Sequence, residues 1–319
     1  MATVSEKSEY YVGIDLGGTL IKAALVSGSG NVEFSHKEPT VRANLSGLVD
    51  QLLKVIQSLA DRLKDDTVCG AGIGVPGNVD SETTEILASP NLQFTAGLNV
   101  RQALGDRLPI PLAVDNDGNA GALGEHRFGA GRGARNMVYI CLGTGVGGGL
   151  ILEGKPFRGS KGYGAELGHT NINPDGKTCL CGGIGCLELE VCAPSIVRRA
   201  RQRLAVDTDS ALKSISGREI TAEDVSVFAG LGDEVCRKVL AETGRRLGIA
   251  LADFVNIFNP DVIIVGGGVS RSGELLLDPA VDEASKRAFP DPFRHCKFRI
   301  AELGDMAGVL GAAALAMEM

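Results

Sequence analysis

One histidine and three cysteines gather in the stretch 164–190, GAELGHTNINPDGKTCLCGGIGCLELE. Their spacing, H-x9-C-x-C-x4-C for His169, Cys179, Cys181 and Cys186, supplies three thiolates and one imidazole. This is the ligand set of a closed tetrahedral Zn²⁺ site. Because four protein ligands leave no position for water, such a zinc would be structural. The alternative interpretation is a set of unconnected buried thiols beside a surface histidine.

Two carboxylates flank these four residues. Glu166 lies three residues before His169, and Glu188 lies two residues after Cys186, so a loop folded around a metal would fix both. Carboxylates accept hydrogen bonds from sugar hydroxyls, and a fixed loop would pre-organise them for that task. His169 could serve twice, with one ring nitrogen on zinc and the other donating to a hydroxyl.

Three glycine-rich turns follow segments of β-strand character. Such turns expose backbone N–H groups without a side chain to block an anion, so they can hold the phosphates of a nucleotide. The threonine hydroxyls would add donors, and the aspartate would hold Mg²⁺ through water. The third turn is expected to open a helix. A tight hairpin that needs positive φ explains any single turn equally well. The candidate residues are Asp15, Gly17, Gly18, Thr19, Gly143, Thr144, Gly145, Gly147, Gly266, Gly267 and Gly268.

Asn116 and Asp117 follow a short apolar strand that ends at Val114. Ligands of α/β proteins bind at the carboxyl ends of strands. A carboxylate at this point could accept the proton of a hydroxyl during phosphoryl transfer. The competing interpretation is a helix N-cap or Asx turn. This interpretation suits Asp115 well, and for Asp117 it is as good as the catalytic interpretation.

Composition excludes several classes of protein. The chain has 319 residues, 44% hydrophobic residues, 44 glycines and a formal net charge of −7. The acidic balance argues against nonspecific nucleic-acid binding, which needs a basic face. No apolar run is long enough to cross a membrane, and the N-terminus lacks the apolar core of a signal peptide. We therefore expect a cytoplasmic protein with reduced thiols and no membrane partner.

Hydrophobic patterning predicts an α/β protein of two similar lobes. Strand, glycine turn and strand recur in 10–27 and 136–154, which indicates an internal duplication. Apolar residues at helical spacing predict helices from Ser46 to Leu63 and from about Val235 to Phe258. The predicted lobes are 1–115 plus 305–319, a small N-terminal lobe, and 116–304, a large lobe with the zinc-binding loop.

The chain resembles the ROK family (repressors, open reading frames and kinases), and within it the glucokinase branch. The resemblance rests on the DxGGT turn at Asp15, "GVPGNVD", "NDGNAGALGE", "GTGVGGG", "ELGH", "CxCGxxGCLE" and "VIIVGGG". It implies a two-lobed actin-like fold, duplicated from a ribonuclease H-like unit, with nucleotide and sugar in the interlobe cleft. It also implies ATP and Mg²⁺ as cofactors and phosphorylation of a hexose at its 6-hydroxyl, with glucose as the expected substrate.

The same resemblance implies a role for individual residues. Asp117 would be the general base. The sugar would be bound by Gly77, Asn78, Asn91, Asn116, Asp117, Glu166, His169 and Glu188. One departure concerns the segment "PNLQFTAGLNV", where Phe94 stands near the position at which glucokinases of this type often have tryptophan.

Several alternatives remain open from the sequence. An N-acetylmannosamine kinase, or another ROK hexose kinase, would need room for a different sugar, such as an acetamido group at C2. A sugar-responsive repressor of the same family would carry a winged helix-turn-helix ahead of Asp15, for which we expect too few residues. A filament or chaperone ATPase would not explain the zinc loop beside two glutamates. The donor could be ATP or polyphosphate, and we expect a homodimer or homotetramer.

Overall fold

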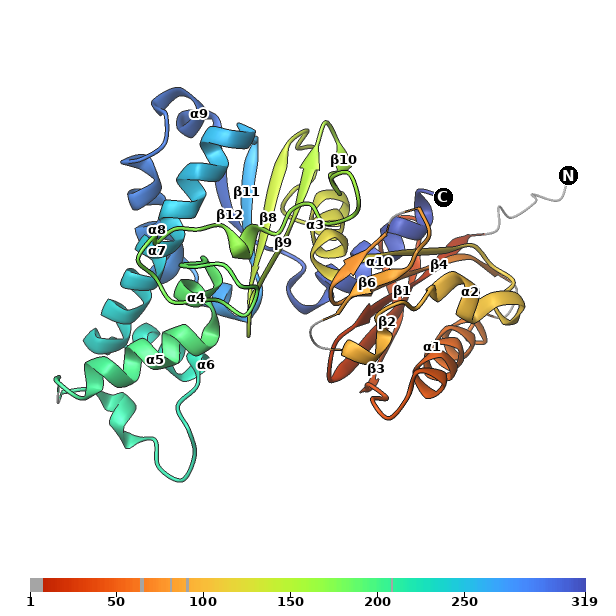
Figure 1. The fold of residues 1–319 in the computed structure, drawn as a ribbon, viewed down its shortest axis with the longest axis horizontal. Helices are drawn as coiled ribbons and strands as arrows, with labels where there is room; N and C mark the ends of the chain where they lie inside the picture. Colours follow the sequence, from red (N-terminus) through yellow and green to blue (C-terminus); the bar gives the residue numbers. More distant parts are fainter. Residues whose placement is uncertain (1–7, 64–65, 81, 90–91, 208) are drawn as a thin grey trace, which may run out of the picture. The chain divides into compact units, whose positions relative to one another are not determined.

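The computed structural model describes residues 8–63, 66–80, 82–89, 92–207 and 209–319, which form two compact units (Figure 1). The first unit contains the N-terminal part of the chain as far as Arg132, together with Pro156–Ala165 and Asp305–Met319. The second contains Gly133–Lys155 and Glu166–Gly304. The chain therefore passes from one unit to the other several times.

The first unit is built on a five-stranded sheet of order β3-β2-β1-β4-β7. Strand β1 pairs antiparallel with β2, which pairs antiparallel with β3, whereas β4 and β7 continue the sheet in parallel. A two-stranded sheet of β5 and β6 is separate. The bounds are β1 Glu9–Leu16, β2 Leu20–Ser27, β3 Val32–Pro39, β4 Thr67–Val75, β5 Asn78–Val79, β6 Ile86–Ala88 and β7 Leu112–Asn116.

Opposite faces of this sheet carry different helices. Helix α1 (Leu45–Ala60) buries Leu48, Leu52 and Leu59 with the strand residues of one face, as the helical spacing predicts, and Asn44 caps its first turn. Helix α10 (Ala307–Met317) packs on the other face. There a Cβ on Gly72 would lie 1.7 Å from the Ala312 carbonyl oxygen, so only glycine permits this approach. A short helix, α2, spans Val100–Leu104.

Helix α3 (Asp117–Phe128) lies in the first unit, beyond the boundary that we predicted after Asp115. Its small residues bring it against α10: a Cβ on Gly311 would lie 1.6 Å from the Ala120 carbonyl oxygen. A Cβ on Gly124 would lie 2.3 Å from that of Ala307. This close backbone contact joins α3 to the C-terminal helix, so the N-terminal segment of the first unit extends to Arg132.

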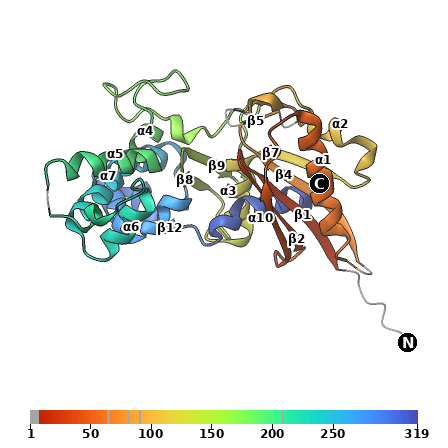
Figure 2. The ribbon, with the colours of Figure 1, turned by 90° about the horizontal axis from the view of Figure 1, so that it is seen from below.

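The second unit repeats the topology of the first, with a sheet of order β10-β9-β8-β11-β12. All five strands are labelled in Figure 1, and Figure 2 shows β8, β9 and β12 from below. Strands β8 and β9 form an antiparallel hairpin, and β11 and β12 add in parallel to β8. This repeat agrees with the duplication inferred from the two glycine-turn hairpins. The bounds are β8 Met137–Leu142, β9 Val146–Leu152, β10 Lys155–Pro156, β11 Val262–Gly266 and β12 Lys297–Ile300.

Helix α7 (Glu234–Phe258) is the longest helix of the second unit, 25 residues with Asp233 as N-cap, and it matches the predicted span closely. It packs tightly on α8, since a Cβ on Gly248 would lie 2.3 Å from the Ala280 carbonyl oxygen. The other α-helices are α4 Glu188–Val191, α5 Ala193–Leu204, α6 Ala222–Gly230, α8 Glu274–Ser285 and α9 Pro290–His295. Short 3₁₀-helices are η1 Gln93–Thr95, η2 Gly105–Arg107, η3 Leu167–His169, η4 Ala211–Ser214, η5 Gly268–Ser272 and η6 Gly304–Met306.

Among the residues that the structure describes, no helix combines the length and apolar character needed to cross a membrane.

Candidate functional site

The carboxyl ends of three parallel strands align in the first unit. Asp15 of β1 pairs in register with Gly74 of β4, and Gly74 pairs with Asp115 of β7. Neighbouring strands lie about 4.8 Å apart, so Asp15 and Asp115 stand on one edge of the sheet at a separation of roughly two strand spacings. This edge is where α/β sheets bind ligands.

Asp117 is the first residue of α3, and the cap of this helix is Asn116. The Asn116 side-chain oxygen accepts from the N–H groups of Gly118 at 2.8 Å and Asn119 at 3.2 Å. Its Nδ2 donates to the Gly77 carbonyl oxygen at 2.9 Å. The Asp117 carboxylate accepts from the Gly118 N–H at 2.8 Å, in the first turn, where the helix dipole favours a negative charge.

Gly77 and Asn78 come to the same place as Asn116 and Asp117. Gly77 has φ +107°, and a Cβ there would lie 2.0 Å from the Ala88 carbonyl oxygen, so the turn into β5 requires glycine. The structure thus brings together four of the five sugar-binding residues predicted in this part of the chain. The fifth, Asn91, lies outside the described residues.

Arg158 is a residue of this region that the sequence analysis missed. Its Nε donates to Asp115 Oδ2 at 2.6 Å, and Asp115 is only 4% exposed. Asp115 Oδ1 accepts from the Asn116 N–H at 2.8 Å and from Asn119 Nδ2 at 3.0 Å. A carboxylate on a buried strand needs a charged or hydrogen-bonding partner, so the sequence indicated that Asp115 has one. It does not say which arginine this partner is.

Asp15 lies within β1, and the hairpin turn itself begins after Leu16, which corrects its predicted place in the turn. Burial raises the pKa of the Asp15 carboxyl, and Lys22, whose Nζ lies 3.8 Å from Oδ2, opposes that rise. Helix α10 packs beside it at Gly308. In the turn, the Gly17 N–H donates to the Leu20 carbonyl oxygen at 3.0 Å, so this predicted phosphate donor is already used by the hairpin.

In the second unit, the predicted metal ligands come together. One ligand atom from each of His169, Cys179, Cys181 and Cys186 lies within 4.8 Å of the others. Cys181 Sγ and Cys186 Sγ are 3.6 Å apart, and Cys179 Sγ is 3.8 Å from His169 Nδ1. A tetrahedral site with Zn–S bonds of about 2.3 Å has edges of about 3.8 Å between sulfur atoms. The four residues therefore fit a zinc ion.

Glu166 stands immediately before η3 (Leu167–His169), and its carbonyl oxygen accepts from the His169 N–H at 3.0 Å. The residue is partly accessible to solvent, and the surrounding protein raises the pKa of the Glu166 carboxyl by desolvation. The nearby charge of Glu188 raises the same pKa further, and His169 opposes it. The two carboxylates and the imidazole are thus close enough to affect one another.

Glu188 begins α4 and reaches the second glycine turn. Its Oε2 accepts from the Val146 N–H at 2.9 Å, and its Oε1 lies 3.9 Å from Cys179 Sγ. A Cβ on Gly145 would lie 2.6 Å from Glu188 Oε2, so a side chain there would displace the carboxylate from its present place. The sequence analysis assigned this turn to phosphate alone and missed that one side of it holds Glu188.

The two glycine turns of the second unit are neighbours, because Gly266 of β11 pairs in register with Cys141 of β8. Gly267 has φ +82°, and a Cβ there would lie 2.4 Å from the Leu142 carbonyl oxygen, directly before Gly143. A helix does open at the triple glycine, but it is the five-residue 3₁₀-helix η5, which starts at Gly268. The α-helix α8 begins only at Glu274, with Gly273 as its N-cap.

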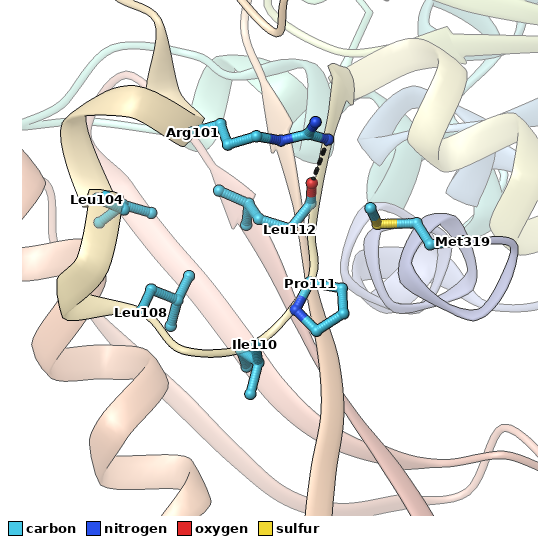
Figure 3. A pocket seen from close by; sticks show the side chains of 8 residues that line it. Arg101, Leu104, Leu108, Ile110, Pro111, Leu112 and Met319 are labelled. Carbon is cyan, nitrogen blue, oxygen red and sulfur yellow. Dashed lines mark hydrogen bonds between the residues drawn. The ribbon is translucent and has the colours of Figure 1, made fainter.

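A cavity of about 260 Å³ lies elsewhere in the first unit, away from the predicted site residues (Figure 3). Apolar side chains dominate its lining, and the Arg101 Nη2 beside them donates to the Leu112 carbonyl oxygen at 2.9 Å. The lining residues are Arg101, Leu104, Gly105, Leu108, Ile110, Pro111, Leu112 and Met319. None of them is a predicted sugar or nucleotide ligand.

Comparisons with known proteins agree with these observations. The sequence matches the ROK family over residues 11–319. It is 36% identical to the glucokinase of Halalkalibacterium halodurans over 95% of this chain and 93% of that protein. It is 33% identical to the xylose repressor of Caldicellulosiruptor bescii over 95% of this chain and 77% of the repressor.

A solved ROK family glucokinase from Streptomyces griseus, in complex with glucose and AMPPNP, superposes with a TM-score of 0.84. It is 36% identical in sequence, and the match covers 97% of this chain and 100% of that one. The predicted fold class, an α/β protein with the two-lobed actin-like fold, is confirmed.

Proposed function

The chain belongs to the ROK family, and from that premise we propose that it is a glucokinase. It transfers the γ-phosphoryl group of ATP to the 6-hydroxyl of glucose. The observation that carries this proposal is the similarity over nearly the whole chain to a glucokinase solved with glucose and an ATP analogue. The similarity extends to the curated glucokinases.

Asp117 is the general base in this proposal. Its carboxylate takes the proton of the glucose 6-hydroxyl as that oxygen forms a bond to the γ-phosphorus of ATP. The bond from the γ-phosphorus to the bridging oxygen breaks, and ADP leaves with that oxygen. The N-cap bonds of Asn116 support the assignment, because they fix the first turn of α3 and with it the position of the carboxylate.

The glucose ligands are assigned to two groups of residues, one beside Asp117 and one beside the proposed zinc ligands. Gly77, Asn78, Asn91 and Asn116 bind the sugar beside the base, and Glu166, His169 and Glu188 bind its ring hydroxyls. Support comes from the convergence of Gly77, Asn78 and Asn116 in the first unit and of the other three in the second. The raised pKa of Glu166 adds to it, because perturbed carboxylates are typical of functional sites.

ATP is assigned to the glycine turns at Gly17–Thr19, Gly143–Gly147 and Gly266–Gly268, and Asp15 would hold Mg²⁺ through water. Bound with ATP, Mg²⁺ would neutralise charge on the phosphate oxygens. Asp15 suits this role because it stands at the carboxyl end of a central strand and its burial disfavours an unpaired negative charge.

We assign a structural zinc to His169, Cys179, Cys181 and Cys186. The fit of their ligand atoms to a tetrahedral site supports this. The ion would do no chemistry, and the loop that it holds would place Glu166 and Glu188. Because thiolate ligands must stay reduced, we also infer a cytoplasmic location. We expect a homodimer or homotetramer. Light scattering on the purified protein measures the molar mass that decides between them.

Release of ADP, measured in a coupled assay, tests the function. The panel contains glucose, mannose, N-acetylmannosamine, N-acetylglucosamine and fructose, each with ATP and with polyphosphate. We expect the highest kcat/KM for glucose with ATP. Preference for N-acetylmannosamine would instead identify the related kinase. If a sugar bound without any turnover and the protein retarded DNA, the similarity to the xylose repressor would be the better guide.

A further inference from the structure

Helix α4 (Glu188–Val191) carries the proposed sugar carboxylate at its first position, yet it has only four residues. A single helical turn is unstable in isolation, because it fixes many dihedral angles for very few hydrogen bonds. Its last carbonyl groups also have no partner within the helix. Something outside α4 must therefore hold it if Glu188 is to keep a fixed position.

Side chains of the next helix, α5, bind the carbonyl groups of this turn. Ser195 Oγ donates to the Leu189 carbonyl oxygen at 2.6 Å, and Arg198 Nη2 donates to the same oxygen at 2.9 Å. Arg199 Nη2 donates to the Glu190 carbonyl oxygen at 2.7 Å. The short helix is thus capped at its end by two arginines and a serine.

Arg199 also reaches the long helix α7. It is 6% exposed, and its Nη1 donates to Thr243 Oγ1 at 2.7 Å. Its Nε lies 3.3 Å from Glu242 Oε1. Each of the three nitrogen atoms of the guanidinium group therefore contacts a different partner. Together these contacts join the backbone of α4 to α7, the longest helix of the unit.

We propose that Arg199 is a positioning residue for Glu188, an inference that rests on the proposed glucokinase function. Arg199 holds the end of α4 against α7, while the Val146 N–H holds the Glu188 carboxylate at the start of α4. The carboxylate then has a fixed place from which to accept sugar hydroxyls, and little ordering is left to occur when glucose binds.

Loss of Arg199 should leave a folded protein, because the acidic groups around it keep other partners. Glu190 Oε2 lies 3.0 Å from Arg246 Nη1, and Glu242 Oε2 lies 3.0 Å from Arg203 Nη2. Arg199→Met removes the buried guanidinium without leaving either carboxylate unpaired. What disappears is the donor to the Glu190 carbonyl oxygen, the connection to Thr243, and one ion pair each to the Glu190 and Glu242 carboxylates.

Steady-state kinetics on Arg199→Met, Arg199→Lys and a control, Arg201→Met, test the proposal. Arg201 lies on the same helix, is exposed, and pairs with the exposed Glu219. For Arg199→Met we expect the KM for glucose to rise about 10- to 100-fold, the scale of a small misplacement in a site. The KM for ATP and the zinc content should stay at the wild-type values. Arg199→Lys should fall between, because lysine keeps the charge without the fork geometry.

A double-mutant cycle with Glu188→Gln separates positioning from general support of the fold. If Arg199 acts through Glu188, Arg199→Met should change the KM for glucose much less in the Glu188→Gln background than in the wild type. Fully additive effects, an unchanged KM for glucose in Arg199→Met, or equal losses in both KM values and zinc content would each overturn the proposal. A wild-type chain without glucose phosphorylation would instead refute the proposed function itself.

Discussion

Asp117 shows how one residue is placed by its neighbour rather than by its own side chain. Asn116 occupies the N-cap and uses its amide on both α3 and Gly77, so the next residue enters the helix as an oriented carboxylate. Sequence reasoning could name the pair but could not say which of Asp115, Asn116 and Asp117 caps the helix. That choice depends on the φ and ψ of each residue, which only the fold fixes.

Asp117→Asn should lower kcat by about 100-fold or more, the low end of the loss expected for a missing general base. Because asparagine keeps the size and a carbonyl acceptor, the fold and the affinity for glucose should be retained. Steady-state kinetics measures kcat, and titration calorimetry on the same preparation measures the affinity for glucose. Near-normal turnover in this variant would place the base elsewhere.

Asp15→Asn should stabilise the protein at neutral pH in the absence of nucleotide and Mg²⁺. Burial raises the pKa of Asp15 in the folded state, so the unfolded chain loses this proton at lower pH than the folded chain. The wild type therefore loses stability as pH rises from the usual aspartate pKa, about 4, through the raised value. Asparagine carries no such penalty.

Urea unfolding at pH 5 and pH 8 measures this difference, with Asp61→Asn, an exposed position, as the control. The stability gained by Asp15→Asn should be larger at pH 8 than at pH 5, whereas the control should show no such trend. At the same time kcat with ATP should fall, since the proposed Mg²⁺ partner is lost. A gain that shrinks as pH rises would contradict the burial argument.

At the scale of elements, local sequence patterns predicted helices correctly, whereas contacts between residues far apart in the sequence were not predicted. The leucine spacing of α1 and the long apolar face of α7 are written in consecutive residues, and both helices appear where expected. The four residues that the spacing predicted as metal ligands likewise lie together in the structure. Arg158 and Arg199 were missed because their partners, Asp115 and the end of α4, are set by tertiary packing.

The proposed zinc-binding loop is the element that would hold both proposed sugar ligands, Glu166 and Glu188. Cys181→Ser removes one of the four proposed zinc ligands, so the variant should contain about one zinc ion fewer per chain. The two hydrophobic sheets should remain folded, because none of their strands contains a ligand. Glucose binding should weaken strongly while ATP binding persists. Metal analysis, far-UV circular dichroism and calorimetry test this, and an active wild type free of zinc would refute the assignment.

The chain contains two units whose sheets have the same topology, and it passes from one unit to the other several times. The order β3-β2-β1-β4-β7 in one unit matches β10-β9-β8-β11-β12 in the other, with equivalent hairpins carrying a glycine turn. The sequence predicted this repeat from the hairpins. It did not predict that α3 belongs to the first unit, because close packing through Gly124 and Gly311 decides it. Nor did it predict that Pro156–Ala165 returns to that unit, where Arg158 pairs with Asp115.

Phosphorus NMR of the wild-type chain with glucose, ATP and Mg²⁺ tests the central claim most directly. The account predicts one glucose 6-phosphate for each ADP formed, with no product when glucose is omitted. Formation of ADP with inorganic phosphate, a phosphate on another carbon of the sugar, or no turnover with glucose would contradict it.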